Sequence, residues 1–310
     1  MDGCIIKIIY KLFNMYKILN NSKQYSGNNT TLNRLSRLLN LELVNNLSKK
    51  MIGIHAYKFG KLVINNNIEF ILIIGGTDIN IDINNINKNK IILETCKQAK
   101  YIVAFNNIIK QKLLNHEIVN KKIKIIPQSI EYIKPIFFDI KYLLKNKFNK
   151  KKINKFFICL GNIRPVKDPM YLKQIFDILY KKSIYLIFIG NILSGDYSFT
   201  KGMIHIGPLE HKYILSCLEQ SNGLINTSIS EGMSISILES MIHKCPVYCR
   251  NNESNSDIIK HNFNGFLFNS PKEFLDLIEL DTSNIIENGY KYVLKYHNSL
   301  DEKRRYSLLL

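Results

Sequence analysis

Short apolar runs alternate with longer helical patterns along the whole chain, and this alternation restricts the fold more than any other feature. The apolar runs lie at residues 52–56, 70–74, 101–105, 123–126, 156–160, 185–189, 203–206, 223–226, 246–249 and 265–268. Helical patterns between them include residues 31–41, 106–114, 170–180, 212–220 and 234–243. Strands that are apolar throughout are typical of parallel sheets covered by helices on both faces. The sequence therefore predicts an α/β protein.

A basic stretch without a strand pattern, residues 141–154, divides the two sets of strands and is interpreted as a linker. We expect two doubly wound, Rossmann-like domains that face each other across a cleft, with ligands at the carboxyl ends of the strands. The predicted domains are 1–145, which is short for this fold, and 152–284, followed by a C-terminal helix in 285–310 that packs back across both. Residues 5–13 or 16–19 supply the first strand, and Met15 is an alternative start of the protein.

Composition restricts the cellular compartment and the classes of binding partner that we expect. No run reaches the ~18 apolar residues of a membrane span, and Lys7 and Lys11 interrupt the apolar start where a signal peptide would be continuous. We therefore expect a cytoplasmic protein whose six cysteines are reduced core residues. The net charge of +18 allows a nucleic-acid-binding protein, but we interpret the lysines as evenly spread in an Asn/Ile/Lys-rich chain. A diffuse positive field would equally attract an anionic small substrate.

The segment 226–239 carries the most informative motif. It follows an apolar strand, opens a helix, and places Glu231 and Glu239 with seven residues between them. A helix start offers free N–H groups to an anion, Gly232 permits close approach of a ligand, and carboxylates accept hydrogen bonds from sugar or ribose hydroxyls. The alternative is helix capping, because Ser228 with Glu231 and Ser236 with Glu239 fit the capping box.

A second strand-to-helix junction, residues 160–169, presents two cations. Arg164 and Lys167 follow Gly161 in the run Gly-Asn-Ile-Arg-Pro-Val-Lys-Asp-Pro. Arginine binds phosphate bidentately and lysine adds a point charge, so this loop is a candidate phosphate site. The alternative is a solvated basic loop.

In the first half, polar groups follow three apolar strands or strand candidates. Gly27 with Asn28 could form a loop beneath a phosphate, and His55 at a strand end could donate a hydrogen bond into the cleft. Asp78 follows a Gly-Gly turn and could be a helix N-cap. A structural role is the alternative for His55.

Together these motifs resemble the retaining glycosyltransferases of family 4, which have the GT-B fold. The resemblance runs from about Ser26 to about Tyr306, is strong over 156–268 and patchy before residue 100. It rests on the Glu231/Glu239 pair in Ser-Glu-Gly-x-Ser-x-x-x-Leu-Glu and on the Arg164–Pro169 loop. The Gly75–Asp78 turn and the Gly27–Asn28 loop add to it.

The resemblance implies a role for each matching position. Arg164 and Lys167 would hold the donor diphosphate, and Glu239 would bond the ribose. Glu231 and the backbone of Gly232, Met233 and Ser234 would hold the donor sugar. His55 and Asp78 would face that sugar from the other domain, Gly27 would join the donor site, and Gly190 with residues 206–208 would shape the base pocket.

The resemblance also implies the reaction. It is a hexosyltransferase-like transfer from a nucleotide diphosphate sugar to an unidentified hydroxyl acceptor, with retained anomeric configuration and with no metal or other cofactor. Cations would offset the charge on the leaving diphosphate in place of a metal. The alternatives are a non-catalytic sugar-nucleotide-binding protein and, less favoured, a basic nucleic-acid-binding protein.

Overall fold

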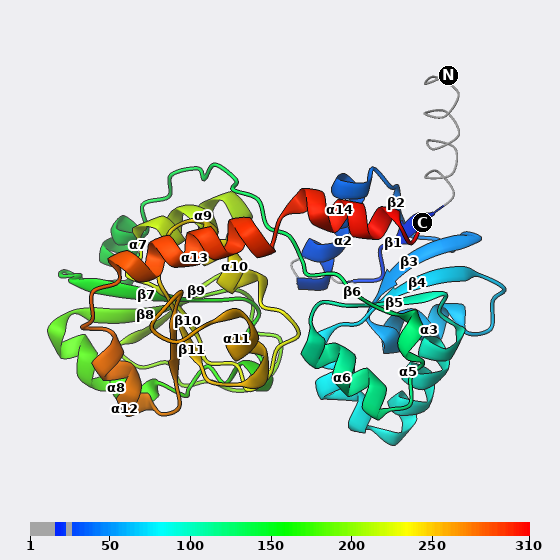
Figure 1. The fold of residues 1–310 in the computed structure, drawn as a ribbon. Coiled ribbons are helices and arrows are strands. Elements are labelled where there is room, and N and C mark those ends of the chain that lie inside the picture. Colours follow the sequence, from blue (N-terminus) through cyan, green and yellow to red (C-terminus); the bar gives the residue numbers. More distant parts are fainter. Residues whose placement is uncertain (1–15, 23–26) are drawn as a thin grey trace, which may run out of the picture. The chain divides into compact units, whose positions relative to one another are not determined.

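The computed structural model describes residues 16–22 and 27–310, and it divides into two compact units, each built on one parallel sheet (Figure 1). The first unit comprises Met1–Ser129, Glu231–Met233 and His297–Leu310, and the second comprises Ile130–Ser230 and Ser234–Tyr296. Each sheet has six strands, all paired in parallel, with helices on its faces. The predicted α/β class with two doubly wound sheets is therefore confirmed.

The sheet of the first unit has the strand order β2-β1-β3-β4-β5-β6. Its strands are β1 (Lys17–Leu19), β2 (Leu43–Val44), β3 (Lys50–Ile54), β4 (Glu69–Ile73), β5 (Tyr101–Ala104) and β6 (Ile123–Ile125). Its helices are α2 (Gly27–Leu39), α3 (Ala56–Val63), α4 (Gly76–Asn80), α5 (Ile86–Gln98), α6 (Asn107–Asn115) and α14 (Ser299–Ser307). Strand β1 falls within the candidate 16–19; the other candidate, 5–13, and the possible start at Met15 lie outside the described residues.

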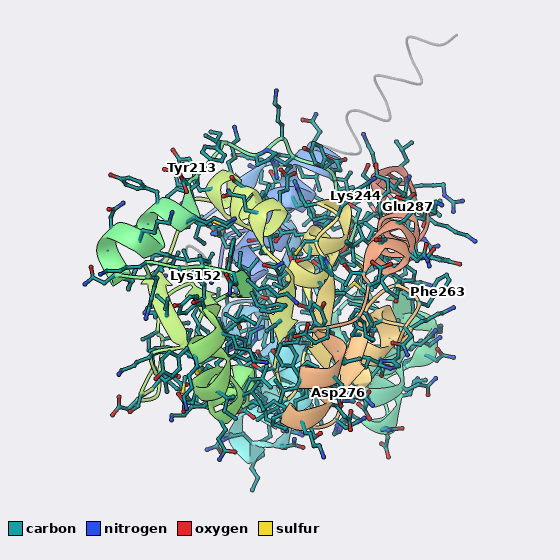
Figure 2. The ribbon with its side chains drawn as sticks, turned by 90° about the vertical axis from the view of Figure 1, so that its left-hand side faces the viewer. Lys152, Tyr213, Lys244, Phe263, Asp276 and Glu287 are labelled. Atoms are coloured by element: carbon teal, nitrogen blue, oxygen red, sulfur yellow. The ribbon has the colours of Figure 1, made fainter. Side chains whose placement is uncertain are left out.

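The sheet of the second unit has the order β12-β11-β10-β7-β8-β9. Its strands are β7 (Lys155–Leu160), β8 (Ile184–Ile189), β9 (Met203–Gly207), β10 (Leu224–Asn226), β11 (Val247–Arg250) and β12 (Phe266–Phe268). Its helices are α7 (Ile140–Phe148), α8 (Lys173–Leu179), α9 (His211–Gln220), α10 (Ile235–Ile242), α11 (Glu253–Ile258), α12 (Pro271–Leu277) and α13 (Ser283–Tyr296). Lys244, which follows α10, lies near α13, with its Nζ 3.4 Å from Glu287 Oε2 (Figure 2).

The apolar runs become strands because both faces of the second sheet are covered. Successive residues of a strand point to opposite faces. Phe157 and Leu186 accordingly pack in one buried cluster, which includes residues of α8 and α12, whereas Phe156 and Tyr185 pack in another. The abundant Asn residues are used at helix starts: Asn85, Asn106, Asn252 and Asn298 each accept backbone N–H bonds as N-caps.

The interpretation of residues 141–154 as a linker is wrong for most of its length. Residues Ile140–Phe148 form α7, capped by Asp139, whose Oδ1 accepts the Tyr142 N–H at 2.8 Å. Ile140 and Leu144 are buried in the core of the second unit. The many lysines concealed these two apolar positions, which lie four residues apart and share one helix face.

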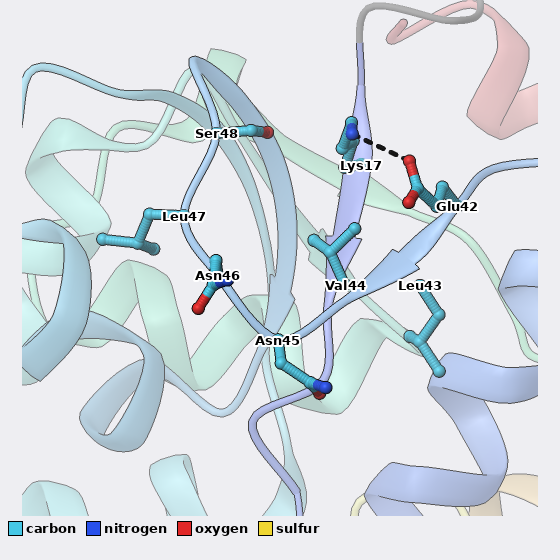
Figure 3. Close-up of a pocket in the computed structure, with 8 residues that line it drawn as sticks. All are labelled: Lys17, Glu42, Leu43, Val44, Asn45, Asn46, Leu47 and Ser48. Atoms are coloured by element: carbon cyan, nitrogen blue, oxygen red, sulfur yellow. Dashed lines mark ion pairs between the residues drawn. The ribbon is translucent and has the colours of Figure 1, made fainter.

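A hollow lies beside the edge strand β2 of the first unit. Figure 3 shows its lining, which consists of Lys17 and residues 42–48. The two charged side chains of this lining, Lys17 and Glu42, neutralise each other across 2.7 Å. The hollow therefore offers no unbalanced charge to an anionic ligand, and we assign no function to it.

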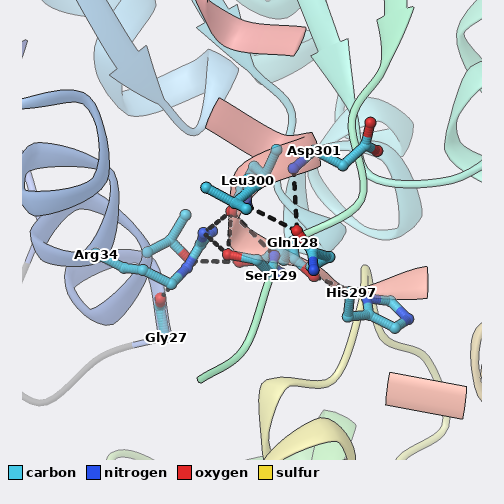
Figure 4. Close-up of polar contacts among 10 residues, drawn as sticks. Gly27, Arg34, Gln128, Ser129, His297, Leu300 and Asp301 are labelled. Carbon is cyan, nitrogen blue, oxygen red and sulfur yellow. Dashed lines mark hydrogen bonds and ion pairs between the residues drawn. The ribbon is translucent and has the colours of Figure 1, made fainter. Parts of the chain in front are cut away.

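The end of the chain completes the first unit (Figure 4). The carboxylate of Glu302 on α14 is buried, forms an ion pair with Arg34 of α2, and accepts hydrogen bonds from Ser129 N at 3.0 Å and Ser129 Oγ at 2.5 Å. His297 Nδ1 lies 2.7 Å from the Gln128 carbonyl oxygen. The C-terminal segment is thus two helices, of which α13 belongs to the second unit and α14 to the first.

Candidate active site

The order of strands in the second sheet marks a ligand site between β7 and β10. The chain runs outward from β7 through β8 and β9 on one side, then returns to start β10 on the other. In open α/β sheets, ligands bind outside the carboxyl ends of the strands at such a reversal. A pocket lies there, lined by residues 159–163, Lys167, residues 225–228 and Ser236.

The cationic loop forms one wall of this pocket. After β7, Gly161 turns with φ of +113°, and Pro165–Lys167 form a single 3-10 turn that ends at Asp168. The Thr227 hydroxyl donates to the Lys167 carbonyl oxygen at 2.8 Å, and Ile229 N–H donates to the Val166 carbonyl oxygen at 2.9 Å. These bonds fix the loop against the segment after β10, so the backbone that carries Arg164 and Lys167 is held in place.

A third cation near this loop is already paired. Arg250 at the end of β11 lies 2.7 Å from the Asp168 carboxylate, and its guanidinium stacks over Tyr171 at 4.1 Å. Asp168 has a left-handed backbone with φ of 41°. Arg250 thus has a structural role. Arg164 and Lys167, which the sequence predicts to contact phosphate, are both half-buried.

Helix α10 starts at the same pocket. Its N-cap is Ser234, whose side chain makes no capping bond to the helix; the Ser234 hydroxyl instead accepts from Asn226 Nδ2 at 3.2 Å. Neither predicted capping box forms, because Ser228 and Glu231 precede the helix and Ser236 and Glu239 lie inside it. The first N–H groups of any α-helix lack intrahelical partners, which suits an anionic or hydroxyl ligand.

Glu239 is held by a residue that the sequence motifs do not single out. Its side chain is largely buried, and Glu239 Oε1 lies 2.6 Å from His211 Nε2, at the start of α9. His211 is 28 positions away in sequence, and no local motif signals the pairing. The contact fixes one carboxylate oxygen of Glu239 and orients the other.

Gly190 ends β8 beside the pocket loop. Its φ is +148°, and a Cβ there would overlap the Gly161 carbonyl group. The carbonyl oxygen of Gly190 lies 2.7 Å from His205 Nε2. Close packing between the ends of β7 and β8 therefore requires a glycine at position 190, independently of the predicted contact with the nucleotide base.

Residues Glu231–Met233 belong to the first unit, and three amide side chains of that unit hold their carbonyl groups. Asn80 Nδ2 donates to Glu231 O at 2.9 Å, Asn106 Nδ2 to Gly232 O at 3.2 Å, and Gln128 Nε2 to Met233 O at 3.4 Å.

The same segment approaches the Gly-Gly turn. The backbones of Gly76 and Gly232 lie so close that a Cβ on Gly76 would overlap Gly232. The glycine at 232 is thus explained by backbone packing in addition to any ligand.

The reversal point of the first sheet lies between β1 and β3, and His55 stands there. It directly follows β3, is 4% exposed, and has a backbone φ of 75°, a region that residues with a Cβ rarely adopt. Such strained positions cluster at functional sites. Gly27 begins α2, the helix that follows β1, and no non-neighbouring atom of residues 16–22 or 27–310 lies within 4 Å of the position that a Cβ would take there.

Two buried carboxylates flank the His55 ring. Asp78 Oδ1 lies 2.5 Å from Nδ1, and Asp82 Oδ2 lies 3.8 Å from Nε2. Asp78 is not the N-cap residue of α4, which is Gly75, but lies three positions further on and accepts the Gly75 N–H at 3.0 Å. It also accepts the Ala56 N–H at the start of α3 at 2.8 Å. With no exposed surface, Asp78 has the contacts of a group that positions His55.

Asp82, which the sequence motifs do not mark, is charge-balanced by Lys88. Lys88 Nζ lies 2.6 Å from Asp82 Oδ1 and 5.3 Å from the centre of the Tyr57 ring. The three groups His55, Asp78 and Asp82 are close enough for metal ligands. The two ring nitrogens of His55 face different carboxylates, and Lys88 already contacts Asp82.

Comparison with known proteins now decides the family. The chain is 33% identical over 278 residues to glycosyltransferase 1 domain-containing protein 1 of Xenopus tropicalis, covering 83% of this chain and 80% of that protein. Residues 141–292 match the family described as glycosyl transferases group 1. The chain belongs to this glycosyltransferase family. The Gly27–Asn28, Gly75–Asp78 and Arg164–Pro169 loops predict a resemblance to glycosyltransferase 1 domain-containing protein 1, and the 33% identity confirms that resemblance for most of the chain.

Solved structures agree on the fold of this glycosyltransferase. HepE of Anabaena, solved with UDP-glucose, superposes with a TM-score of 0.76 over 95% of this chain and 98% of HepE at 11% identity. A glycosyltransferase from Rickettsia africae superposes with a TM-score of 0.67 over 99% of this chain and 93% of its own at 16% identity. The GT-B fold is thereby confirmed.

The cysteines of the described residues are thiols, and most of them are buried. The five described cysteines are free thiols, as expected, and burial raises the pKa of Cys96 and Cys217 to about 12 and of Cys245 to about 11. These thiols stay protonated and act as apolar core residues.

Over residues 16–22 and 27–310, no helix combines the length and apolarity needed to cross a bilayer.

Proposed function

We propose that this glycosyltransferase takes a sugar from a nucleotide diphosphate sugar bound at the β7/β10 reversal point and transfers it to a hydroxyl acceptor. The observation that carries the proposal is the pocket itself, where the cationic loop and the start of α10 meet. Cations and helix N–H groups are two features that bind a diphosphate. Because HepE was solved in complex with UDP-glucose, uridine donors are the first to test.

In this proposal Arg164 and Lys167 contact the diphosphate and stabilise the charge that develops on it as the glycosidic bond breaks. Glu239, oriented by His211, accepts hydrogen bonds from the ribose hydroxyls. Glu231 and the backbone of Gly232, Met233 and Ser234 hold the sugar hydroxyls. Gly190 and residues 206–208 border the base, and Gly27 borders the donor from the first unit.

His55 would contact the donor sugar, and its strained backbone and three charged neighbours would position it. Asp78 lies 2.5 Å from Nδ1, whereas Asp82 lies 3.8 Å from Nε2, beyond hydrogen-bond distance, and is paired with Lys88. Nε2 is therefore the ring nitrogen that would contact a sugar hydroxyl. The transition state would have oxocarbenium character, as in glycosidic cleavage generally. We propose retention of configuration, with a donor phosphate oxygen accepting the acceptor proton and no divalent metal.

The free, buried cysteines fit a reducing compartment, and we propose that the enzyme acts in the cytoplasm. A purely binding protein would keep the pocket but lack turnover, whereas a nucleic-acid-binding protein would prefer oligonucleotides to nucleotides.

The test is a thermal-shift screen of nucleoside diphosphates and their sugar esters, followed by assays of donor hydrolysis and transfer. A donor at 100 times its Kd adds ~2.7 kcal/mol of stability. We expect one diphosphate sugar to raise Tm and to be turned over, with no shift from a short oligonucleotide at equal phosphate concentration. A shift with oligonucleotides alone would refute the proposal, and binding without turnover would reduce it to a binding function.

A further inference from the structure

One surface of the second unit, Ile130–Lys152, exposes large apolar side chains that the core does not use. We call it the connector–α7 surface. Phe137 is 75% exposed, Tyr142 66% and Ile136 47%. These three lie within seven positions of the sequence. Tyr132 is 56% exposed, but its ring centre lies 4.7 Å from that of His243 and its hydroxyl donates to Glu219 at 3.4 Å. Single exposed apolar residues are ordinary, but a gathering of them marks an interaction site.

Positive charge is concentrated on the same surface. These 23 residues contain seven lysines against two acidic residues, a net charge of +5, whereas the whole 310-residue chain carries +18. Six of the lysines are exposed: Lys134, Lys141, Lys145, Lys147, Lys151 and Lys152. This segment is thus more basic than the chain as a whole.

The exposed side chains are available because other residues anchor the segment. Ile140 and Leu144 of α7 are buried in the core. Phe138 lies against Tyr213 of α9 with ring centres 5.7 Å apart, and its N–H donates to Ser216 Oγ at 3.0 Å. Figure 2 labels Tyr213 and Lys152, which lie on the same side of the view. The surface is thus a fixed part of the second unit.

We propose that the connector–α7 surface docks on an anionic lipid bilayer. Exposed aromatic and aliphatic side chains enter the boundary between headgroups and acyl chains, and flanking lysines add attraction to anionic lipids. The surface has no arginine and contributes an aliphatic side chain, Ile136, features that fit a lipid headgroup layer better than stacked bases or base edges. Docking would hold the enzyme at a membrane surface without a spanning helix.

The experiment is sedimentation of the full-length protein with vesicles of phosphatidylcholine alone or with about one third phosphatidylserine. A lysine near an anionic surface contributes about fivefold in binding. The triple variant Lys134→Gln, Lys141→Gln, Lys145→Gln should therefore lower binding to anionic vesicles about 100-fold. Phe137→Ser with Tyr142→Ser should lower it at least tenfold at constant charge. Raising the salt to 0.5 M should weaken wild-type binding strongly.

Two matched controls keep the result specific. Lys58→Gln, Lys121→Gln, Lys272→Gln removes three exposed lysines elsewhere, and Ile86→Ser removes a side chain that is 76% exposed. Both should change binding less than threefold. The proposal is overturned if wild type binds neutral and anionic vesicles equally, or if the control triple loses as much as the test triple. It is also overturned if a short RNA binds more tightly than vesicles through the same lysines. Far-UV circular dichroism and donor affinity, unchanged in all variants, separate this result from that of the donor site.

Discussion

The two sheets obey one topological rule but present opposite chemistry at their reversal points. In the second unit the β7/β10 pocket is lined by the loop after β7, which contributes Lys167, by the buried residues 225–228, and by Ser236 in the first turn of α10. In the first unit the β1/β3 point holds a nearly buried histidine enclosed by two carboxylates and a lysine. A reversal point with a lysine and a helix start suits an anionic group, whereas a closed and strained one suits a single directed hydrogen bond. This difference is the reason for proposing donor binding in the second unit and a catalytic contact from His55 in the first.

The largest effect is expected from the buried ion pair that completes only the first unit. Glu302→Ala leaves Arg34 charged and without its carboxylate in a buried site, and breaking such a pair costs about 3–5 kcal/mol. Thermal unfolding followed by hydrogen exchange should show earlier opening of peptides from the first unit, with the second unit unchanged. Asp301→Ala, next to it on the solvent side of α14, is the control and should cost less than about 1 kcal/mol. Equal losses in both units would mean that the units unfold as one.

His55→Ala should separate chemistry from binding. We expect turnover to fall about 100-fold or more, on the scale of a lost catalytic hydrogen bond or proton transfer, with donor Kd within threefold. Steady-state kinetics with calorimetry measures both. His116→Ala, another histidine of the first unit, is the matched control and should leave turnover unchanged. Asp82→Asn should lower turnover less, by about tenfold, because it would only weaken the positioning of the His55 ring. Normal turnover in His55→Ala would remove the first unit from the chemistry.

Arg164→Ala should give the reverse pattern. Loss of a charge-assisted phosphate contact should weaken nucleotide diphosphate binding by about 1.5–3 kcal/mol, without a change in melting temperature. Lys181→Ala, an exposed lysine of the same unit, is the control. Unchanged affinity in Arg164→Ala would leave the basic loop as a solvated surface.

A smaller effect concerns pH and the first unit. Burial, with a contribution from the Arg34 charge, lowers the pKa of His297 below its ordinary value of 6.5. The unfolded chain therefore takes up a proton before the folded one does. Stability from this group is complete above about pH 6.5 and is lost as the pH falls below it, by at most ~1.4 kcal/mol per pH unit. His297→Gln should flatten the fall in Tm between pH 7 and pH 5.5; an unchanged slope would assign the acid sensitivity to other groups.

No effect is expected from metal removal. Lys88 already balances Asp82, and cations of the loop are proposed to offset the diphosphate charge. Activity in excess EDTA should stay within twofold of the untreated enzyme. Strict dependence on magnesium or manganese would contradict the metal-free mechanism and would indicate His55, Asp78 and Asp82 as metal ligands.

Local patterns predicted most of the fold, because continuous apolar strands and Gly-containing junctions are signals of short range. The strands β3 to β12 all overlap predicted apolar runs. As expected, the loop with Arg164 and Lys167 follows a strand, β7, and the segment with Glu231 follows another, β10. Helix α7 was not predicted, because its two buried residues, Ile140 and Leu144, lie in a lysine-rich stretch of the sequence. The residues that contact the site residues were not predicted either. They are His211, which contacts Glu239, and the Asp82–Lys88 pair beside His55. Those contacts join separate elements, so no spacing in the sequence reveals them.

Donor binding at the β7/β10 point of the second unit is tested most directly by hydrogen exchange with and without the nucleotide diphosphate sugar that the screen identifies. We expect slower exchange in peptides that cover Gly161–Lys167 and residues 226–239, in wild type and in His55→Ala alike. In Arg164→Ala we expect little slowing at the same ligand concentration. Protection confined to other segments, such as the hollow beside β2 or the connector–α7 surface, would contradict it.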